Sequence, residues 1–100
     1  TDADTKLMLY NMSQDRWVEY QLDASQLYNG INIRYASAID SEVAIYVDGE
    51  PIKMHALPKT GSMSTWQTAQ IDGIPVEGKH YLRIHVISGT MNMNWFQLTR

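Results

Sequence analysis

Apolar and polar residues alternate with a period of two through most of this chain, and that spacing is the strongest constraint on its fold. The stretch His80 to Ile87 shows it most clearly, because Leu82, Ile84 and Val86 all fall on one side. Successive side chains of a β-strand point to opposite faces, so this spacing predicts a strand with one buried face. No long stretch has apolar residues at helical spacing. The chain is therefore predicted to be all-β.

The same alternation predicts further strands, separated by turn signals. They cover residues 16–22, 31–35, 42–47, 66–71 and 89–98, with a shorter apolar run at 6–10. Asp48-Gly49 between two β-rich runs predicts a hairpin, and Pro51 restricts its second strand to a sheet edge or a bulge. Residues 23–30 and 72–78 have the composition of turns. Short strands with regular turns predict an antiparallel β-sandwich of the jelly-roll type, as a single domain over residues 1–100.

Charge and cysteine content exclude several classes of partner and site. The net charge is -3, and the eight Lys and Arg residues are scattered singly. Nucleic acid requires a basic stripe, and a membrane surface requires a basic amphipathic helix, so neither is expected as a partner. Without cysteine the chain has no disulfide, thiol nucleophile or thiolate metal site. The expected state is a monomer.

Candidate catalytic residues do not form a recognisable pattern. The chain lacks a Gly-x-Ser-x-Gly elbow, and His80 and His85 lie on opposite faces of one predicted strand. The acids that a glycoside hydrolase would need stand in predicted loops or on outer strand faces, where they are usually solvated. These acids are Asp15, Glu19, Asp40 and Glu42. The chain is predicted not to be an enzyme, with no catalytic residues and no established metal ligands.

Aromatic residues favour a binding role. Three Trp and six Tyr accompany a single Phe, and rings with a polar tip suit surfaces that meet amphipathic ligands such as sugars. Trp17 points away from the apolar side of its strand, and Asn92 lies where a turn meets the closing strand. Trp66 and Trp95 lie within alternating strands, so both are expected in the core more than in a site.

A series of short blocks resembles a known family. In chain order the blocks are Asp15 to Tyr20, Ile31 to Ser37, Val47-Asp48-Gly49, Leu57 to Gly61, Trp66-Gln67-Thr68, Gly78 to Leu82, and Asn92 to Phe96. Each block is weak alone, but their order and spacing resemble a family 6 carbohydrate-binding module. The resemblance implies an antiparallel sandwich that binds a polysaccharide and is attached to a secreted glycoside hydrolase acting on plant or algal polymers.

The resemblance also implies a site. Family members hold a glycan among the loops at one end of the sandwich, between two aromatic rings and an Asn. These positions correspond to Trp17, Met63 and Asn92 in this chain, where Met63 replaces a ring. Asn94, Gln14 and Arg16 are further candidates. Some members use a cleft on a sheet face, for which Tyr46, Glu42 and Arg34 are the outward-facing candidates.

A structural calcium is a further implication of the resemblance. Members usually have a first strand with acids that hold a structural calcium, and Asp2 and Asp4 are the acids available here, although that strand has no clear counterpart. No cofactor is otherwise required. The rival hypothesis is a structural sandwich that has lost sugar binding and packs against a neighbouring domain, because exposed Met63 and Met91 would suit protein contacts.

Overall fold

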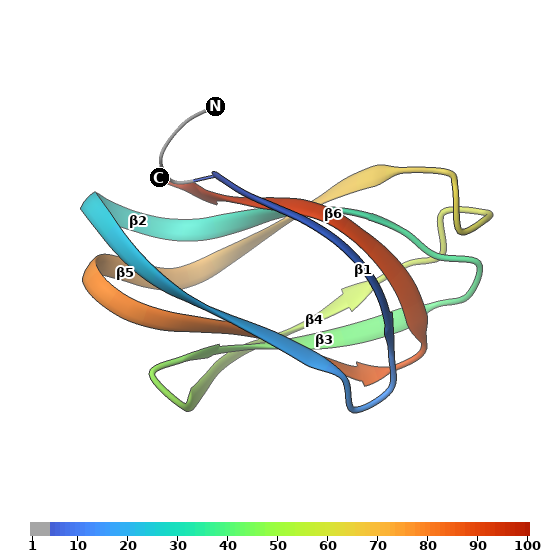
Figure 1. The fold of residues 1–100 in the computed structure, drawn as a ribbon, viewed down its shortest axis with the longest axis horizontal. Coiled ribbons are helices and arrows are strands. Elements are labelled where there is room, and N and C mark those ends of the chain that lie inside the picture. The colour runs from blue at the N-terminus through green and yellow to red at the C-terminus, as the bar shows by residue number, and fades with distance from the viewer. Residues whose placement is uncertain (1–4) are drawn as a thin grey trace.

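The computed structural model describes the backbone of residues 5–100 and the side chains of residues 11–100. The backbone forms antiparallel strands joined by short loops (Figure 1). They are β1 (Thr5–Ser13), β2 (Trp17–Ala36), β3 (Ser41–Val47), β4 (Glu50–Leu57), β5 (Gln67–Ser88) and β6 (Thr90–Thr99). None of the described residues belongs to a helix long and apolar enough to cross a membrane.

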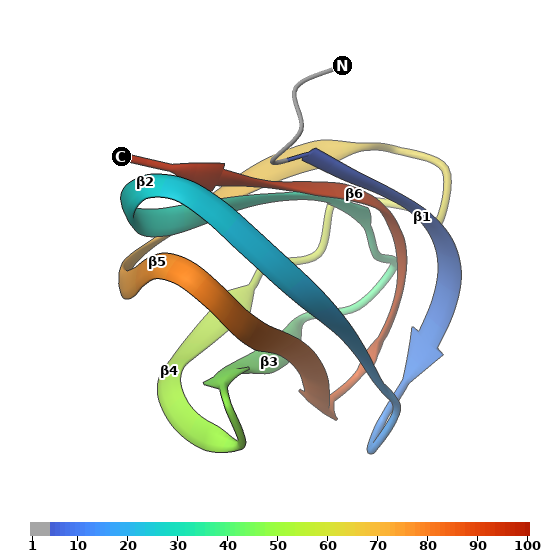
Figure 2. The ribbon, with the colours of Figure 1, turned by 60° about the vertical axis from the view of Figure 1, so that its left-hand side comes forward.

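Two long, bent strands turn one continuous hydrogen-bonded sheet into two layers. The strand order is β1-β6-β2-β5-β3-β4, and both β2 and β5 contribute to each layer. The second half of β2 pairs with β6 and with the start of β5, and we call this layer, with β1, sheet I. The first half of β2 pairs with the end of β5, which pairs with β3, and this layer, with β4, is sheet II. Figures 1 and 2 show the two layers folded over each other.

The bends fall where the sequence predicted turns. Pairing of β2 with β5 shifts register between Ala24 and Gly30, opposite residues 72–78. Gly73 and Gly78 have φ angles of 81° and 79° there, a conformation that favours glycine. The predicted separate strands 16–22 and 31–35 are therefore one strand, and so are 66–71 and 80–87. Turn-like composition marked the bends correctly, but the ladder continues around them.

The core lies between the layers and follows the predicted alternation. Leu22, Ile33, Ile45 and Ile84 are buried, and their neighbours at spacing two are buried or, at Tyr20 and Val47, partly buried against the core. On each side the intervening residues face outward. The all-β antiparallel sandwich predicted from the sequence is therefore confirmed.

A bulge in β6 corrects the prediction for Trp95. Arg34 pairs with Trp95 while the next residue, Tyr35, pairs with Met93, so Asn94 is the extra residue. Two consecutive residues, Asn94 and Trp95, then fall on the outer side, and Phe96 becomes the fully buried ring. Trp66 also stays half-buried, because it precedes β5 instead of lying within it. Neither tryptophan is a core residue.

The predicted β3–β4 hairpin is confirmed. Asp48 and Gly49 turn the chain with φ angles of 53° and 83°. β4 is the edge strand of sheet II, and the register shifts where Pro51 pairs with Tyr46. Proline lacks an N–H for a ladder, so it is tolerated at this edge and bulge.

Candidate functional site

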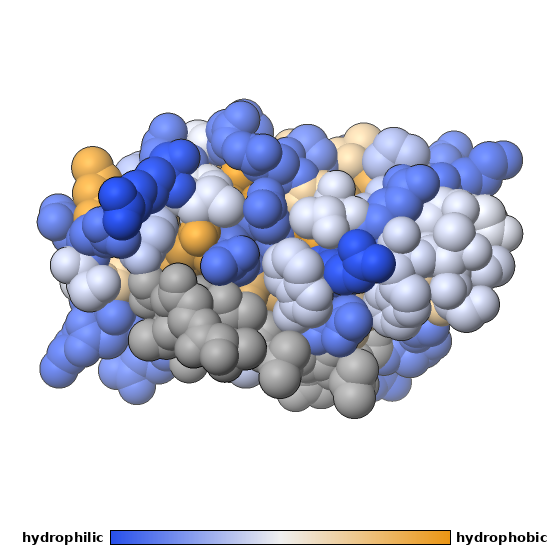
Figure 3. Space-filling model, turned by 90° about the horizontal axis from the view of Figure 1, so that it is seen from above, coloured by the Kyte–Doolittle hydropathy of each residue, from blue (hydrophilic) through white to orange (hydrophobic). Residues whose placement is uncertain are grey.

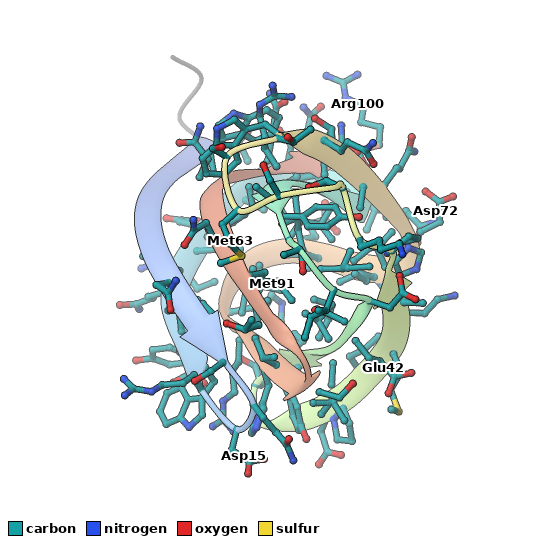
Figure 4. All side chains as sticks on the ribbon, turned by 90° about the vertical axis from the view of Figure 1, so that its right-hand side faces the viewer. Asp15, Glu42, Met63, Asp72, Met91 and Arg100 are labelled. Carbon is teal, nitrogen blue, oxygen red and sulfur yellow. The ribbon has the colours of Figure 1, made fainter. Side chains whose placement is uncertain are left out.

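The loops at one end of the sandwich are tightly held. We call this region the loop end; it consists of residues 37–40, residues 58–66 and the first residues of β6 (Figure 4). Thr60 N–H donates to the Ser37 carbonyl at 2.8 Å, and Ser37 N–H donates to Thr60 Oγ1 at 3.0 Å. The Tyr35 hydroxyl donates to the Pro58 carbonyl at 2.7 Å. Loop 58–66 is thus anchored to the end of β2.

Asn92 fastens the same loop from the other side. Its Nδ2 donates to the Met63 carbonyl at 2.8 Å, and its Oδ1 accepts from Asn11 Nδ2 at 3.0 Å. Asn11 lies directly opposite Asn92 on β1. The structure therefore brings Asn92 and Met63 together, as predicted, and adds Asn11, which sequence reasoning missed.

The two methionines differ in exposure. Met63 is half-buried at the loop end, whereas Met91 is fully buried between the layers. The expectation that Met91 is exposed is wrong, because its position in β6 points inward together with Met93. Of these two methionines, Met63 is the one that can meet a ligand or a partner.

Trp17 belongs to a different surface from Asn92. It pairs with His85 on β5, faces outward from sheet II and is 51% exposed. Asn92 faces outward from sheet I. Gln14 and Arg16 are exposed in the turn before Trp17, and Arg16 N–H donates to the Ser13 carbonyl at 2.9 Å. Figure 4 shows that this turn, in which Asp15 is labelled, lies well away from Met63.

The remaining candidates also divide between the two sheets. Asn94 is half-buried on the outer side of β6, at its bulge. Arg34 lies in sheet I and its Nη1 donates to Thr68 Oγ1 at 3.3 Å, so it does not share a face with Tyr46 and Glu42 of β3. That expected grouping is wrong, because the bend of β2 carries Arg34 into the other layer.

Around Trp17 the outer side of sheet II holds a compact cluster. The Arg83 guanidinium lies 4.5 Å from the centre of the Trp17 ring and 5.1 Å from that of Tyr46. Its Nε donates to Glu19 Oε2 at 3.3 Å. We call these residues the Trp17 cluster: Trp17, Glu19, Tyr46 and Arg83.

The Trp17 cluster combines a flat ring with oriented polar groups. A guanidinium stacked on an aromatic face is attracted by the ring quadrupole, which limits the motion of both groups. Beside the ring, the Glu19 carboxylate offers a hydrogen-bond acceptor and the Arg83 guanidinium offers hydrogen-bond donors to a ligand. Sequence reasoning missed Arg83, because only the pairing of Glu19 with Arg83 across β2 and β5 reveals their contact.

A second charged pair lies at the other end of the β3–β4 hairpin. Asp48 Oδ1 accepts from Tyr81 N–H at 2.8 Å, and its Oδ2 bonds His80 Nδ1 at 2.5 Å. The Tyr81 N–H and the His80 ring hold the pKa of Asp48 below its usual value. The Asp48 carboxylate, with a smaller effect of the Glu77 carbonyl, raises the pKa of His80. The pair pins the turn of the hairpin to β5.

No group of three or more His, Cys, Asp and Glu side chains suited to a metal ion occurs in the part of the chain that the structure describes. Asp2 and Asp4 lie outside the described residues. The predicted structural calcium stays a prediction that rests on those two acids alone.

Comparison with known families identifies the kind of module. The model of a family described as carbohydrate binding module (family 35) matches residues 1–98. The chain belongs to this family. Carbohydrate-binding modules are in general non-catalytic and bind sugars. No curated protein matches the chain.

Solved structures share the fold of this family 35 module. A family 6 module studied for its binding sub-sites is 18% identical with a TM-score of 0.84, covering 99% of this chain and 84% of that one. A family 6 module from Clostridium cellulolyticum, in complex with xylose, is 26% identical with a TM-score of 0.78, covering 89% and 75%. An arabinoxylan arabinofuranohydrolase of glycoside hydrolase family 43 from Bacillus subtilis, in complex with cellotetraose, is 16% identical with a TM-score of 0.81. The match covers 94% of this chain and 21% of the hydrolase. The sequence prediction of a family 6 type of module is thus confirmed, with family 35 as the matching family model.

Proposed function

We propose that this module binds a polysaccharide through the Trp17 cluster on the outer side of sheet II. The observation that carries the proposal is the exposed Trp17 ring, held beside the Arg83–Glu19 pair. A sugar ring has apolar C–H faces that stack on an indole, and its hydroxyl edges bond to carboxylate and guanidinium groups. The Trp17 cluster offers all three kinds of group within one small area.

The opposite face is less suited to this role. Figure 3 looks onto the sheet I side and shows mostly hydrophilic side chains with apolar ones scattered among them. Trp95 is half-buried there. Among the side chains that the structure describes, the exposed aromatic rings are Trp17 and Tyr81, and both lie on sheet II.

Native affinity electrophoresis of the isolated module tests the proposal. The gels contain xylan, a soluble cellulose derivative, laminarin, mannan or agarose. We expect one polymer to retard the module and Trp17→Ala to remove the retardation. Leu27→Ala is the matched control, because Leu27 is 59% exposed at the bend of β2. A folded module that no gel retards would contradict the proposal.

The loop end is a second candidate location for the sugar. Sequence reasoning predicted six candidates there, namely Trp17, Met63, Asn92, Asn94, Gln14 and Arg16, and of these Asn92 and Met63 bond to each other. An Asn side chain has two N–H donors and an oxygen with two lone pairs, so the two bonds of Asn92 leave one donor and one acceptor for a sugar hydroxyl. Retardation lost in Asn92→Ala but kept in Trp17→Ala would favour this location.

We further propose that the module targets an attached glycoside hydrolase to a plant or algal polysaccharide outside the cell. Support comes from the hydrolase relative, in which the matched part is one segment of a larger chain. Holding an enzyme on a long polymer raises the local substrate concentration even when each contact is weak. In such an enzyme, deleting the module should slow hydrolysis of insoluble polymer and spare short soluble substrates. Equal rates on both would contradict the targeting role.

A structural module packed on a neighbouring domain is the competing function. Burial of Met91 removes part of its support, but Ile52 and Met54 are exposed on the edge strand β4. Exposed apolar residues on an edge strand suit contact with another domain. Absence of sugar binding together with a loss of affinity for that domain in Met54→Asp would favour this function.

A further inference from the structure

A row of outward side chains extends from the Trp17 cluster along β5. Tyr81, Arg83 and His85 alternate with the buried Leu82, Ile84 and Val86, so all three point outward from sheet II. On β2 they face Gln21, Glu19 and Trp17 in register. The two strands therefore present three successive cross-strand pairs on one surface.

The outer pairs of this row each carry an exposed aromatic ring. Trp17 is 51% exposed and Tyr81 is 50% exposed. Tyr81 lies opposite Gln21, four residues beyond Trp17. At about 3.4 Å per residue, the two rings are roughly 14 Å apart along the strands. The Glu19–Arg83 pair lies between them.

The backbone at Tyr81 is fixed by the neighbouring hairpin. Tyr81 N–H donates to Asp48 Oδ1 at 2.8 Å, and the Tyr81 carbonyl accepts from Asp48 N–H at 2.8 Å. At the other end, Arg83 packs on Trp17. Both rings are therefore carried by positions that are held before any ligand arrives, which lowers the entropy cost of binding.

We propose that Trp17 and Tyr81 are the two stacking rings of one extended site, which binds an internal stretch of a linear polysaccharide. This inference rests on the proposed function of the Trp17 cluster. A polysaccharide lying along β2 and β5 stacks on a ring at each end, meets Glu19 and Arg83 between the rings, and meets Gln21 beside Tyr81. A monosaccharide or disaccharide reaches one ring only, so affinity depends on chain length.

Isothermal titration of the intact module with cello-, xylo- and laminari-oligosaccharides, from disaccharide to hexasaccharide, tests the inference. We expect the affinity of the wild type to rise at least tenfold over the series that binds. In Tyr81→Ala the ratio of hexasaccharide to disaccharide affinity should fall toward one. Tyr81→Phe keeps the ring and should keep the ratio, and Leu27→Ala is the control for an exposed apolar truncation.

The outcomes separate the two proposals. An unchanged length ratio in Tyr81→Ala, together with loss of binding in Trp17→Ala, overturns the extended site and leaves the Trp17 cluster in place. A wild type that binds the disaccharide as tightly as the hexasaccharide also overturns the extended site. A folded wild type that binds no member of any series and no polymer in the gels overturns the proposed function itself.

Discussion

The loop end and the Trp17 cluster both carry polar groups but use them differently. At the loop end, the amide of Asn92 bonds to the Met63 carbonyl and to Asn11, and the residue beside it is a flexible methionine. On sheet II, the Glu19–Arg83 pair stands next to an exposed indole ring. The loop end uses its hydrogen bonds to hold loop 58–66, whereas the Trp17 cluster presents an exposed aromatic ring to the solvent.

The difference teaches how burial decides which surface is available to a ligand. Polar groups that already bond to each other have fewer donors and acceptors left for a ligand. An exposed ring contributes favourable free energy of binding, because a ligand stacked on it removes apolar surface from water. Four predictions break or sharpen this contrast.

The largest effect concerns the core that both surfaces share. Phe96→Ala should lower the free energy of unfolding by about 3–5 kcal/mol, because it leaves a cavity in place of a fully buried ring. Trp95→Ala, at the adjacent outward position, should cost clearly less. Chemical denaturation of the two variants measures both. Equal losses would contradict the bulge that places Trp95 on the outer side.

The next effect separates the two surfaces in binding. Trp17→Ala should weaken polysaccharide binding by about 2 kcal/mol or more, as buried aromatic anchors do when truncated. Titration with the polymer that retards the module measures this loss. Trp17→Phe keeps a smaller ring and should retain part of the affinity. Full affinity in Trp17→Ala would move the site away from sheet II.

Asn92→Ala should act mainly on the loop. Loss of its bond to Met63 should cost about 1 kcal/mol of stability. Amide hydrogen exchange in loop 58–66 should speed up, since the loop loses one of its anchors. Asn94→Ala, close by on β6, is the matched control for the exchange rates only, because Asn94 is itself a candidate sugar ligand. If glycan affinity falls while exchange is unchanged, Asn92 contacts the sugar and the loop end is the site.

The smallest effect distinguishes the hairpin end of sheet II by its pH dependence. Asp48 raises the pKa of His80 above 6.5. The contribution of the His80–Asp48 pair to stability is therefore complete below pH 6.5 and is lost as the pH rises through the pKa of His80 in the folded state. The pKa of Asp48 is lowered below 3.8, chiefly by the Tyr81 N–H. The contribution of the Asp48 carboxylate to stability is therefore present above pH 3.8 and is lost as the pH falls through the pKa of Asp48 in the folded state. The contribution is therefore greatest between these values.

Thermal melts measure this dependence. The wild type should lose stability relative to His80→Gln as the pH is raised from the window below 6.5 to neutral and mildly alkaline values. His55→Gln is the control, because the same change is made at another half-buried histidine of sheet II. Parallel curves for wild type and His80→Gln would show that the pair does not hold the turn.

Much of the fold follows from short-range sequence pattern. Alternation predicted which residues of 18–22, 31–35 and 82–86 face the core, and Asp48-Gly49 with Pro51 predicted an edge hairpin. These predictions succeed because side-chain direction in a strand depends on period alone, and a turn depends on the φ angles of its own residues. The resemblance in the blocks likewise predicted a carbohydrate-binding module.

The sequence alone therefore determined the inward or outward direction of most side chains and the kind of module. Only the tertiary structure decided which outward residues share a surface. Trp17 and Asn92 both follow turns, yet the bends of β2 and β5 place them on different sheets. The bulge of β6 moved Trp95 outward, and strand pairing brought Arg83 beside Trp17. Pairing and bending join residues far apart in the chain, and no local pattern encodes that register.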